Sequence, residues 1–221
     1  MRVLALGGAV GPAVYTVLVI VCGALRPGYN HLTQLISELG ARGTAHAGLL
    51  NLAGAIPAGV LIAGFGVATL RLLSSGRRSV LASGLVAFYG VAMIVFGILP
   101  CDPGCPPPGP RTSVAATIHS SVALAASVAA IVGIGLWARE FRQMPGFRDL
   151  WAYTGLASAA GLAFLIAFVL SLDGGTLVGL WQRLLVGTLF VWCAVVALRL
   201  FRGAKGPRRR GSLGGSVPDA A

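Results

Sequence analysis

Six long apolar stretches divide the chain, and each is long enough to cross a lipid bilayer as a helix. A transmembrane helix needs about 20 consecutive apolar residues, whereas the strands of a membrane β-barrel alternate apolar and polar residues. The stretches lack that alternation, and only 10% of the chain is charged, against about a quarter in a soluble domain. The sequence therefore predicts an all-α polytopic membrane bundle with six transmembrane helices, at about residues 3–25, 47–70, 79–100, 113–137, 151–171 and 177–199.

The first of these stretches predicts a retained helix rather than a cleaved signal peptide. Its apolar part exceeds the ~7–15 residues of a signal-peptide core, and no good A-x-A cleavage site follows it. We therefore expect residues 3–25 to form the first membrane span.

Basic residues gather on one side of the predicted spans. Because cytoplasmic loops carry the excess of Lys and Arg, this asymmetry predicts a multi-pass protein of the cell (plasma) membrane with both termini in the cytoplasm. It also accounts for the net charge of +11 without a nucleic acid, so the predicted partners are membrane lipids. On the basic side lie 13 of the 17 Lys and Arg residues, namely Arg2, Arg71, Arg77, Arg78, Arg139, Arg142, Arg148, Arg199, Arg202, Lys205, Arg208, Arg209 and Arg210.

The composition changes after the last apolar stretch and predicts two regions. Residues 1–202 form the six-span domain, and residues 203–221, which are rich in Gly, Pro, Ser and charge, form a disordered basic cytoplasmic tail. The basic cluster of this tail either fixes the topology alone or also contacts anionic lipid headgroups.

The first outer loop, residues 26–48, contains the pattern of a short amphipathic helix. Apolar residues recur at positions i, i+3, i+4 and i+7, which share one helix face. Asn30 can cap the helix and Gly40 can end it. The helix is expected to lie in the outer interface or over the bundle, and its polar face is either only solvated or part of a site. The apolar face contains Leu32, Leu35, Ile36 and Leu39, and the polar face contains His31, Gln34 and Glu38.

The predicted topology places most groups capable of chemistry at the outer side. His119 falls within the fourth span, where a histidine serves either a functional site or a hydrogen bond between helices. Arg183 opens the sixth span, where it either extends to the interface, pairs with an outer carboxylate, or binds a lipid phosphate. The outer histidines and carboxylates are His31, His46, His119, Glu38, Asp102 and Asp173.

The second outer loop begins with two cysteines that flank an Asp-Pro-Gly turn. Such a turn can bring Cys101 and Cys105 close enough for a disulfide, and the outer side is oxidising. The short ring between them leaves both the bridged and the free state open. The cysteine and histidine spacing matches no closed zinc site, and we predict no metal or cofactor.

Three segments together resemble a known family: "YNHLTQLISELGA" after the first span, "LPCDPGC" followed by "IHS", and "LWQRLLVG" at the start of the last span. They resemble the membrane family called domain of unknown function 998, from Pro27 to about Leu200. The resemblance implies a six-helix integral membrane protein without an established activity. Its pattern matches Tyr29, Ser37, Glu38, Leu39, Gly40, Pro100, Asp102, His119, Gln182 and Arg183.

These residues lead to one candidate site and several functions. The first hypothesis is a protein that binds, senses or moves a lipid or another amphiphile through an outer polar site. The second is an intramembrane hydrolase with Ser37, His119 and an acid, or with zinc on histidines, although no H-E-x-x-H or G-x-S-x-G is present. The third is a transporter, although the spans hold almost no acids. The candidate ligand site comprises Tyr29, Ser37, Glu38, Asp102, His119, Gln182 and Arg183.

Overall fold

The computed structural model describes residues 1–203, and these residues form helices and loops without a strand. Six helical segments are long and apolar enough to cross a membrane, so the predicted all-α fold with six spans is confirmed. The fourth span continues to Gln143, beyond the predicted end. The predicted tail lies, apart from Gly203, outside the described residues. The spans are formed by α1 (Arg2–Ala5) with α2 (Gly7–Leu25), the π-helix η2 (Leu49–Ala55) with α3 (Ile56–Leu73), α4 (Arg77–Ile98), α5 (Val114–Gln143), the 3-10 helix η3 (Arg148–Leu150) with α6 (Trp151–Ser171), and α7 (Val178–Phe201).

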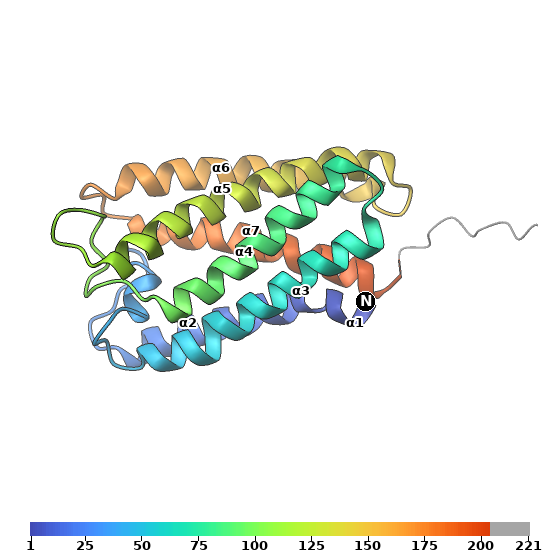
Figure 1. Ribbon diagram of the computed structural model, residues 1–221. Coiled ribbons are helices and arrows are strands. Elements are labelled where there is room, and N and C mark those ends of the chain that lie inside the picture. The colour runs from blue at the N-terminus through green and yellow to red at the C-terminus, as the bar shows by residue number, and fades with distance from the viewer. Residues whose placement is uncertain (204–221) are drawn as a thin grey trace, which may run out of the picture.

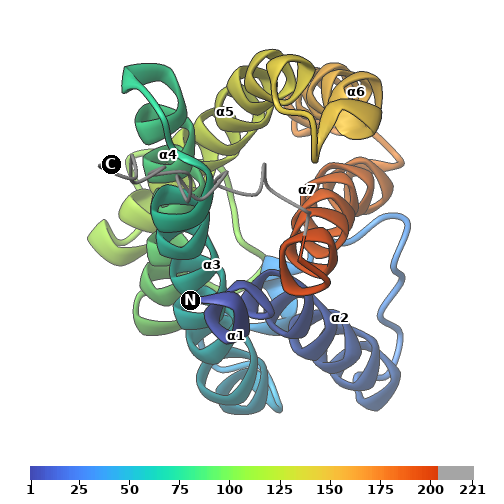
Figure 2. The same cartoon turned by 90° about the vertical axis from the view of Figure 1, so that its right-hand side faces the viewer.

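The spans form a closed ring in the order of the sequence. Each helix contacts the next one along the chain, and α2 also contacts α7, as the view along the bundle shows (Figure 2). Met1 and Gly203 lie at the same end, because the number of spans is even (Figure 1). We call this end, on the right in Figure 1, the inner end. The opposite end, which carries loops 26–48, 99–113 and 172–177, is called the outer end, following the sequence-based topology.

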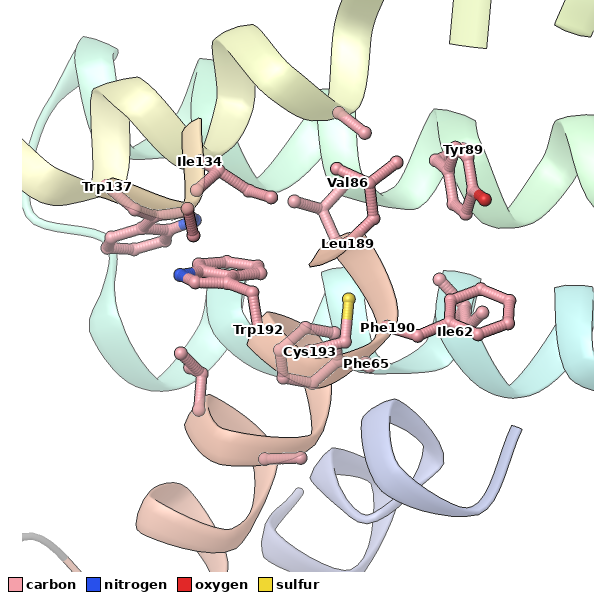
Figure 3. Close-up of a cluster of buried hydrophobic side chains, with 14 of the residues drawn as sticks. Ile62, Phe65, Val86, Tyr89, Ile134, Trp137, Leu189, Phe190, Trp192 and Cys193 are labelled. Carbon is pink, nitrogen blue, oxygen red and sulfur yellow. The ribbon is translucent and has the colours of Figure 1, made fainter. Parts of the chain in front are cut away.

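Aromatic and aliphatic side chains fill the centre of the ring in its inner half (Figure 3). Trp137 of α5 and Trp192 of α7 are both fully buried there. The indole N–H of Trp192 donates to the hydroxyl of Thr154 on α6, 3.2 Å away, so this buried polar group is satisfied. The inner half is therefore a solid core, and it holds helices that are distant in sequence in a fixed arrangement.

Helices α3 and α4 approach each other closely because glycines face the contact. A Cβ atom added at Gly59 would lie 2.6 Å from the carbonyl oxygen of Gly90, and one added at Gly66 would lie 2.6 Å from the backbone nitrogen of Ala87. Membrane helices gain most of their association energy from such packing, since lipid removes the hydrophobic driving force between helices. The α3–α4 pair is thus the most tightly joined wall of the ring.

We predict that Gly66→Ala destabilises the bundle by about 1–3 kcal/mol, because the added methyl group collides with the backbone of α4. Gly84→Ala on α4 is the matched control, because no atom lies within 4 Å of a Cβ at that position. Thermal unfolding in detergent should show a lower Tm for the first variant and an unchanged or higher Tm for the second. Equal Tm values would contradict the close packing of α3 and α4.

Candidate ligand-binding site at the outer end

The outer half of the ring encloses a cavity of about 330 Å³. Its walls come from α2, η2, α4, α5, α6 and α7, and loops 26–48 and 99–113 cover it at the outer end. Ligand sites in proteins typically measure ~300–1,000 Å³ and combine apolar walls with a few polar groups. This cavity has that composition, since its polar lining consists of Ser37, Asn51, His119, Ser120, Ser121, Ser127 and Gln182 together with the hydroxyls of Tyr15 and Tyr89.

The imidazole of His119 is held in a defined orientation at the edge of the cavity. Its Nδ1 lies 2.9 Å from the carbonyl oxygen of Leu99, at the end of α4, and its ring lies 5.1 Å from the ring of Phe96. A carbonyl oxygen can only accept, so Nδ1 carries the proton of this bond and Nε2 is the second functional atom. Nε2 has no hydrogen-bond partner within residues 1–203, so it remains available to a molecule in the cavity.

One side of the cavity reaches the lipid-facing surface between α5 and α6. Its lining there includes Leu124 of α5, which is 50% exposed, Val169 of α6, which is 42% exposed, and Leu172, the residue that follows α6, which is 37% exposed. The two helices are close at the inner end and spread apart toward the outer end (Figure 1). The cavity is therefore bounded laterally by side chains that lipid can reach.

The predicted amphipathic helix of the first outer loop does not form as a continuous helix. Turns span residues 31–34, and only the 3-10 helix η1 (Ser37–Leu39) follows. Asn30 accepts from the backbone N–H of Leu32 at 2.8 Å, as a capping side chain would, but Gly40 adopts φ −98° rather than the left-handed conformation. The apolar face is buried only in part, because Ile36 and Leu39 are buried and Leu32 is exposed.

The backbone of this loop bonds to α7 and to nearby side chains, which is why it does not complete a helix. The carbonyl of Leu32 accepts from the N–H of Leu180 at 2.9 Å, at the start of α7. The N–H of Ile36 donates to the side-chain oxygen of Gln182 at 2.6 Å. A Cβ at Gly179 would lie 2.7 Å from the carbonyl oxygen of His31, so a glycine is required for this contact. Tertiary partners thus replace the bonds of an α-helix.

Arg183 and Tyr29 form the centre of this attachment, which we call the Arg183 clamp. The guanidinium donates to the carbonyl oxygens of Gln34 and Gly179, both at 2.9 Å, and to the hydroxyl of Tyr29 at 2.5 Å. The Tyr29 hydroxyl in turn donates to the carbonyl of Leu35 at 2.8 Å. The clamp therefore fixes the loop that covers the cavity.

Glu38 does not pair with Arg183. Its carboxylate accepts from the side-chain amide of Gln34 at 3.0 Å and from the N–H of Leu35 at 2.9 Å. Its carbonyl accepts from Arg26 at 2.9 Å. Glu38 closes the turn of its own loop and is not among the residues that line the cavity.

Asp102 holds Ser113, the N-cap residue of helix α5. Its two oxygens accept from the N–H and the hydroxyl of Ser113, at 2.7 and 2.8 Å, and Arg42 of the first loop lies 3.7 Å away. Hydrogen bonds to the charged form favour it, so Ser113, and then the charge of Arg42, hold the pKa of Asp102 below its usual range. Asp102 thereby ties both outer loops to α5.

A disulfide joins Cys101 and Cys105, whose Cα atoms are 5.2 Å apart. The turn between them is closed by a hydrogen bond from the N–H of Cys105 to the carbonyl of Asp102, at 2.8 Å, and Gly104 supplies a φ of +77°. Three prolines follow directly and line the cavity from the loop side, and we call residues 106–108 the proline strap. The disulfide thus anchors the start of this proline strap.

The structure divides the predicted site residues into two groups. Ser37, His119 and Gln182 line the cavity, whereas Tyr29, Glu38, Asp102 and Arg183 hold the loops that cover it. Within residues 1–203, no hydrogen bond or ion pair joins Glu38, Asp102, His119 and Arg183 to one another.

The part of the cavity lining that was not predicted includes Asn51 and the proline strap. Asn51 interrupts an apolar stretch, and a polar residue within a span is a signal that points to an interior site. The proline strap carries no such signal, because its position over the cavity depends on the turn that precedes it.

The histidines do not assemble a metal site in the described part of the chain, where no group of three His, Cys, Asp or Glu residues lies close enough together. The carbonyl of His46 accepts from the N–H groups of Leu49 and Leu50 at the start of the second span. The ring of His31 packs edge-on against Tyr29 at 5.1 Å, and burial, followed by the charge of Arg183, lowers the pKa of His31. Within residues 1–203, no hydrogen bond joins Ser37 to His119, so a preformed serine–histidine pair is not observed.

The fold and the cavity define a class of multi-pass membrane proteins in which a six-helix ring encloses a pocket in one half. A family model described as a protein of unknown function (DUF998) matches residues 9–199. The chain therefore belongs to this family, and the resemblance based on the three sequence segments is confirmed. Searches of curated proteins and of solved structures return no match.

We predict that Tyr29→Phe loosens the first outer loop, because it leaves a donor of Arg183 and the carbonyl of Leu35 without a partner. Loss of such bonds costs about 1–3 kcal/mol. Amide hydrogen exchange in residues 26–48 should become about tenfold faster or more. The control is Tyr153→Phe, since the Tyr153 hydroxyl has no hydrogen bond within residues 1–203. Unchanged exchange in Tyr29→Phe would contradict the clamp.

We also predict a stability loss in acid that depends on Asp102. Because its pKa is lower in the folded than in the unfolded protein, its contribution is complete above the ordinary aspartate pKa and disappears as the pH falls through the folded-state value. Asp102→Asn should lower the Tm at neutral pH and reduce the acid dependence of Tm. Asp173→Asn, at an exposed position in loop 172–177, should change neither. Equal acid dependence in all three proteins would exclude this role.

Proposed function

We propose that the protein binds a lipid-like amphiphile from the outer leaflet of the membrane in the outer cavity. The single observation that supports this most directly is the combination of an apolar cavity with a lateral edge exposed between α5 and α6. A soluble ligand would need a water-filled opening, whereas an amphiphile can enter sideways from lipid. Such binding does not require a chemical reaction at the site.

The proposed ligand places its hydrocarbon tail along α5 and α6 and its polar group under the loops. The apolar wall beside the tail is formed by Met93, Phe96 and Leu165. The tail extends out of the cavity between Leu124 and Val169. Nε2 of His119 and the side chains of Ser120 and Asn51 provide hydrogen-bonding groups to the polar end. Polar groups buried by binding would then find partners, which binding in an apolar environment requires.

We infer that the outer end faces away from the cytoplasm and that the membrane is the plasma membrane. The excess of Lys and Arg at the opposite end supports this orientation. The disulfide between Cys101 and Cys105 also supports it, because disulfides persist in oxidising compartments.

We predict that Ala123→Phe reduces amphiphile binding, because Ala123 lines the cavity and a benzyl group would fill part of it. Ala125→Phe is the matched control, since Ala125 is exposed on the same helix and does not line the cavity. The probe is lysophosphatidylcholine, and binding to the purified full-length protein is measured by native mass spectrometry. A loss of about tenfold or more is expected for Ala123→Phe alone, equivalent to about 1.4 kcal/mol. Equal binding by both variants would overturn the proposal.

A further inference from the structure

A second hollow lies on the lipid-facing side of the ring, between α2 and α7. This groove measures about 330 Å³, and its long sides are formed by Thr16, Val19 and Ile20 of α2 and by Val186 and Gly187 of α7. Ile20 is 57% exposed, so the groove is open to lipid. We propose that the groove binds one anionic phospholipid, with its phosphate at Arg183 and His31 and an acyl chain along the apolar sides.

The shape of the groove fits such a lipid because its polarity changes along its length. Arg183 and His31 are the only ionisable lining residues besides Tyr15 within residues 1–203, and both belong to the outer end. The imidazole of His31 lies directly on α2, where a Cβ at Gly23 would be 2.6 Å from its Cε1 atom. Below these two residues the lining is almost entirely apolar. A charged head at one end and a hydrocarbon chain along the rest match this arrangement.

No ion pair within residues 1–203 neutralises the charge of Arg183. The ion pairs within residues 1–203 are Arg42–Asp102, Arg78–Glu140 and Arg199–Asp149, and Arg183 takes part in none of them. Its three hydrogen bonds within residues 1–203 go to neutral oxygens, and its buried Nε has no partner among these residues. A guanidinium has five N–H donors, so two remain unused. A cation next to lipid is costly without an anion, and the anion that a membrane supplies is phosphate.

The guanidinium also lies near the outer end of its span. Arg183 is five residues into α7, about 8 Å from its start. The side chain of Arg183 turns back toward the outer end, however, and its guanidinium donates to the carbonyl of Gly179 in the first turn. A span of about 36 Å exceeds the ~30 Å hydrocarbon core by about 6 Å, so the start of α7 reaches the headgroup boundary. A guanidinium that bonds back to the first turn therefore lies within reach of the phosphate groups of the outer leaflet.

The groove is distinct from the outer cavity, although Tyr15, Ile36 and Val186 line both and form the wall between them. The cavity opens between α5 and α6, on other helices of the ring. The lipid in the groove would be a bound component of the outer end. Its phosphate would also neutralise the charge of Arg183, which fixes the first loop. This inference does not depend on the proposed function.

The test uses Gly187→Leu, which places a larger side chain in the groove, and no atom lies within 4 Å of a Cβ at Gly187. Its matched control is Gly84→Leu, an exposed glycine on α4 with the same open space. The full-length protein is purified from nanodiscs containing equal amounts of phosphatidylglycerol and phosphatidylcholine with identical chains. Native mass spectrometry then measures which lipid stays bound. Arg183→Gln is compared in parallel, although it also removes the clamp.

Wild-type protein and Gly84→Leu should each retain one phosphatidylglycerol in about tenfold preference to phosphatidylcholine. Gly187→Leu and Arg183→Gln should lose most of that preference. Ala123→Phe should keep it, while Gly187→Leu should keep lysophosphatidylcholine binding, which separates the groove from the cavity. Equal retention of the two lipids by the wild type, or equal retention of phosphatidylglycerol by Gly187→Leu and Gly84→Leu, would overturn the proposal.

Discussion

The outer end of this protein depends on one contact, the attachment of the first outer loop to α7 by the guanidinium of Arg183. Arg183 lies 149 positions from Gln34 in the chain. Its bonds to Gln34 and Tyr29 hold the loop backbone where it covers the cavity. Gln182 adds a bond to Ile36, and Gly179 allows the loop to lie against the first turn of α7. Without this attachment, the apolar interior of the outer half would be open to the headgroup region, because the solid core of the ring lies further in.

The ring combines one closed wall with one open wall. Glycines bring the backbones of α3 and α4 together, so these helices contact each other along their length. Helices α5 and α6 have glycines at their contact only further in, and these glycines meet side chains rather than backbone, since Gly135 faces Ser158 and Gly161 faces Ile131. Toward the outer end they carry larger exposed residues, such as Leu124 and Val169, and they spread apart (Figure 1). Small residues therefore determine which helix pairs are closed, and the gap that remains faces lipid.

The spans could be predicted from the sequence because the bilayer imposes a length and a polarity on every crossing segment. The first outer loop could not, because its apolar spacing is typical of a helix whose backbone bonds stay within the segment. Here the carbonyls of Leu32 and Gln34 bond to α7 instead, and the N–H of Ile36 bonds to Gln182. Such partners are distant in sequence, and no local pattern indicates them. The roles of Asp102 and Glu38 could not be predicted for the same reason, since a carboxylate that holds an N-cap residue or closes a turn looks the same in sequence as one that binds a ligand.

The residues through which the chain resembles its family lie mainly in the cover of the cavity and less in its lining. Tyr29, Glu38, Gly40, Asp102 and Arg183 each bond to a loop, or support one, at the outer end. Only Ser37, Gly40, His119 and Gln182 of the pattern line the cavity, and Gln182 also holds the loop. A pattern of this kind specifies how the outer end is closed, whereas the apolar walls can change size without affecting it. Under the proposed function, the identity of the ligand depends on lining residues such as Met93, Ala123 and Leu165, which no motif contains.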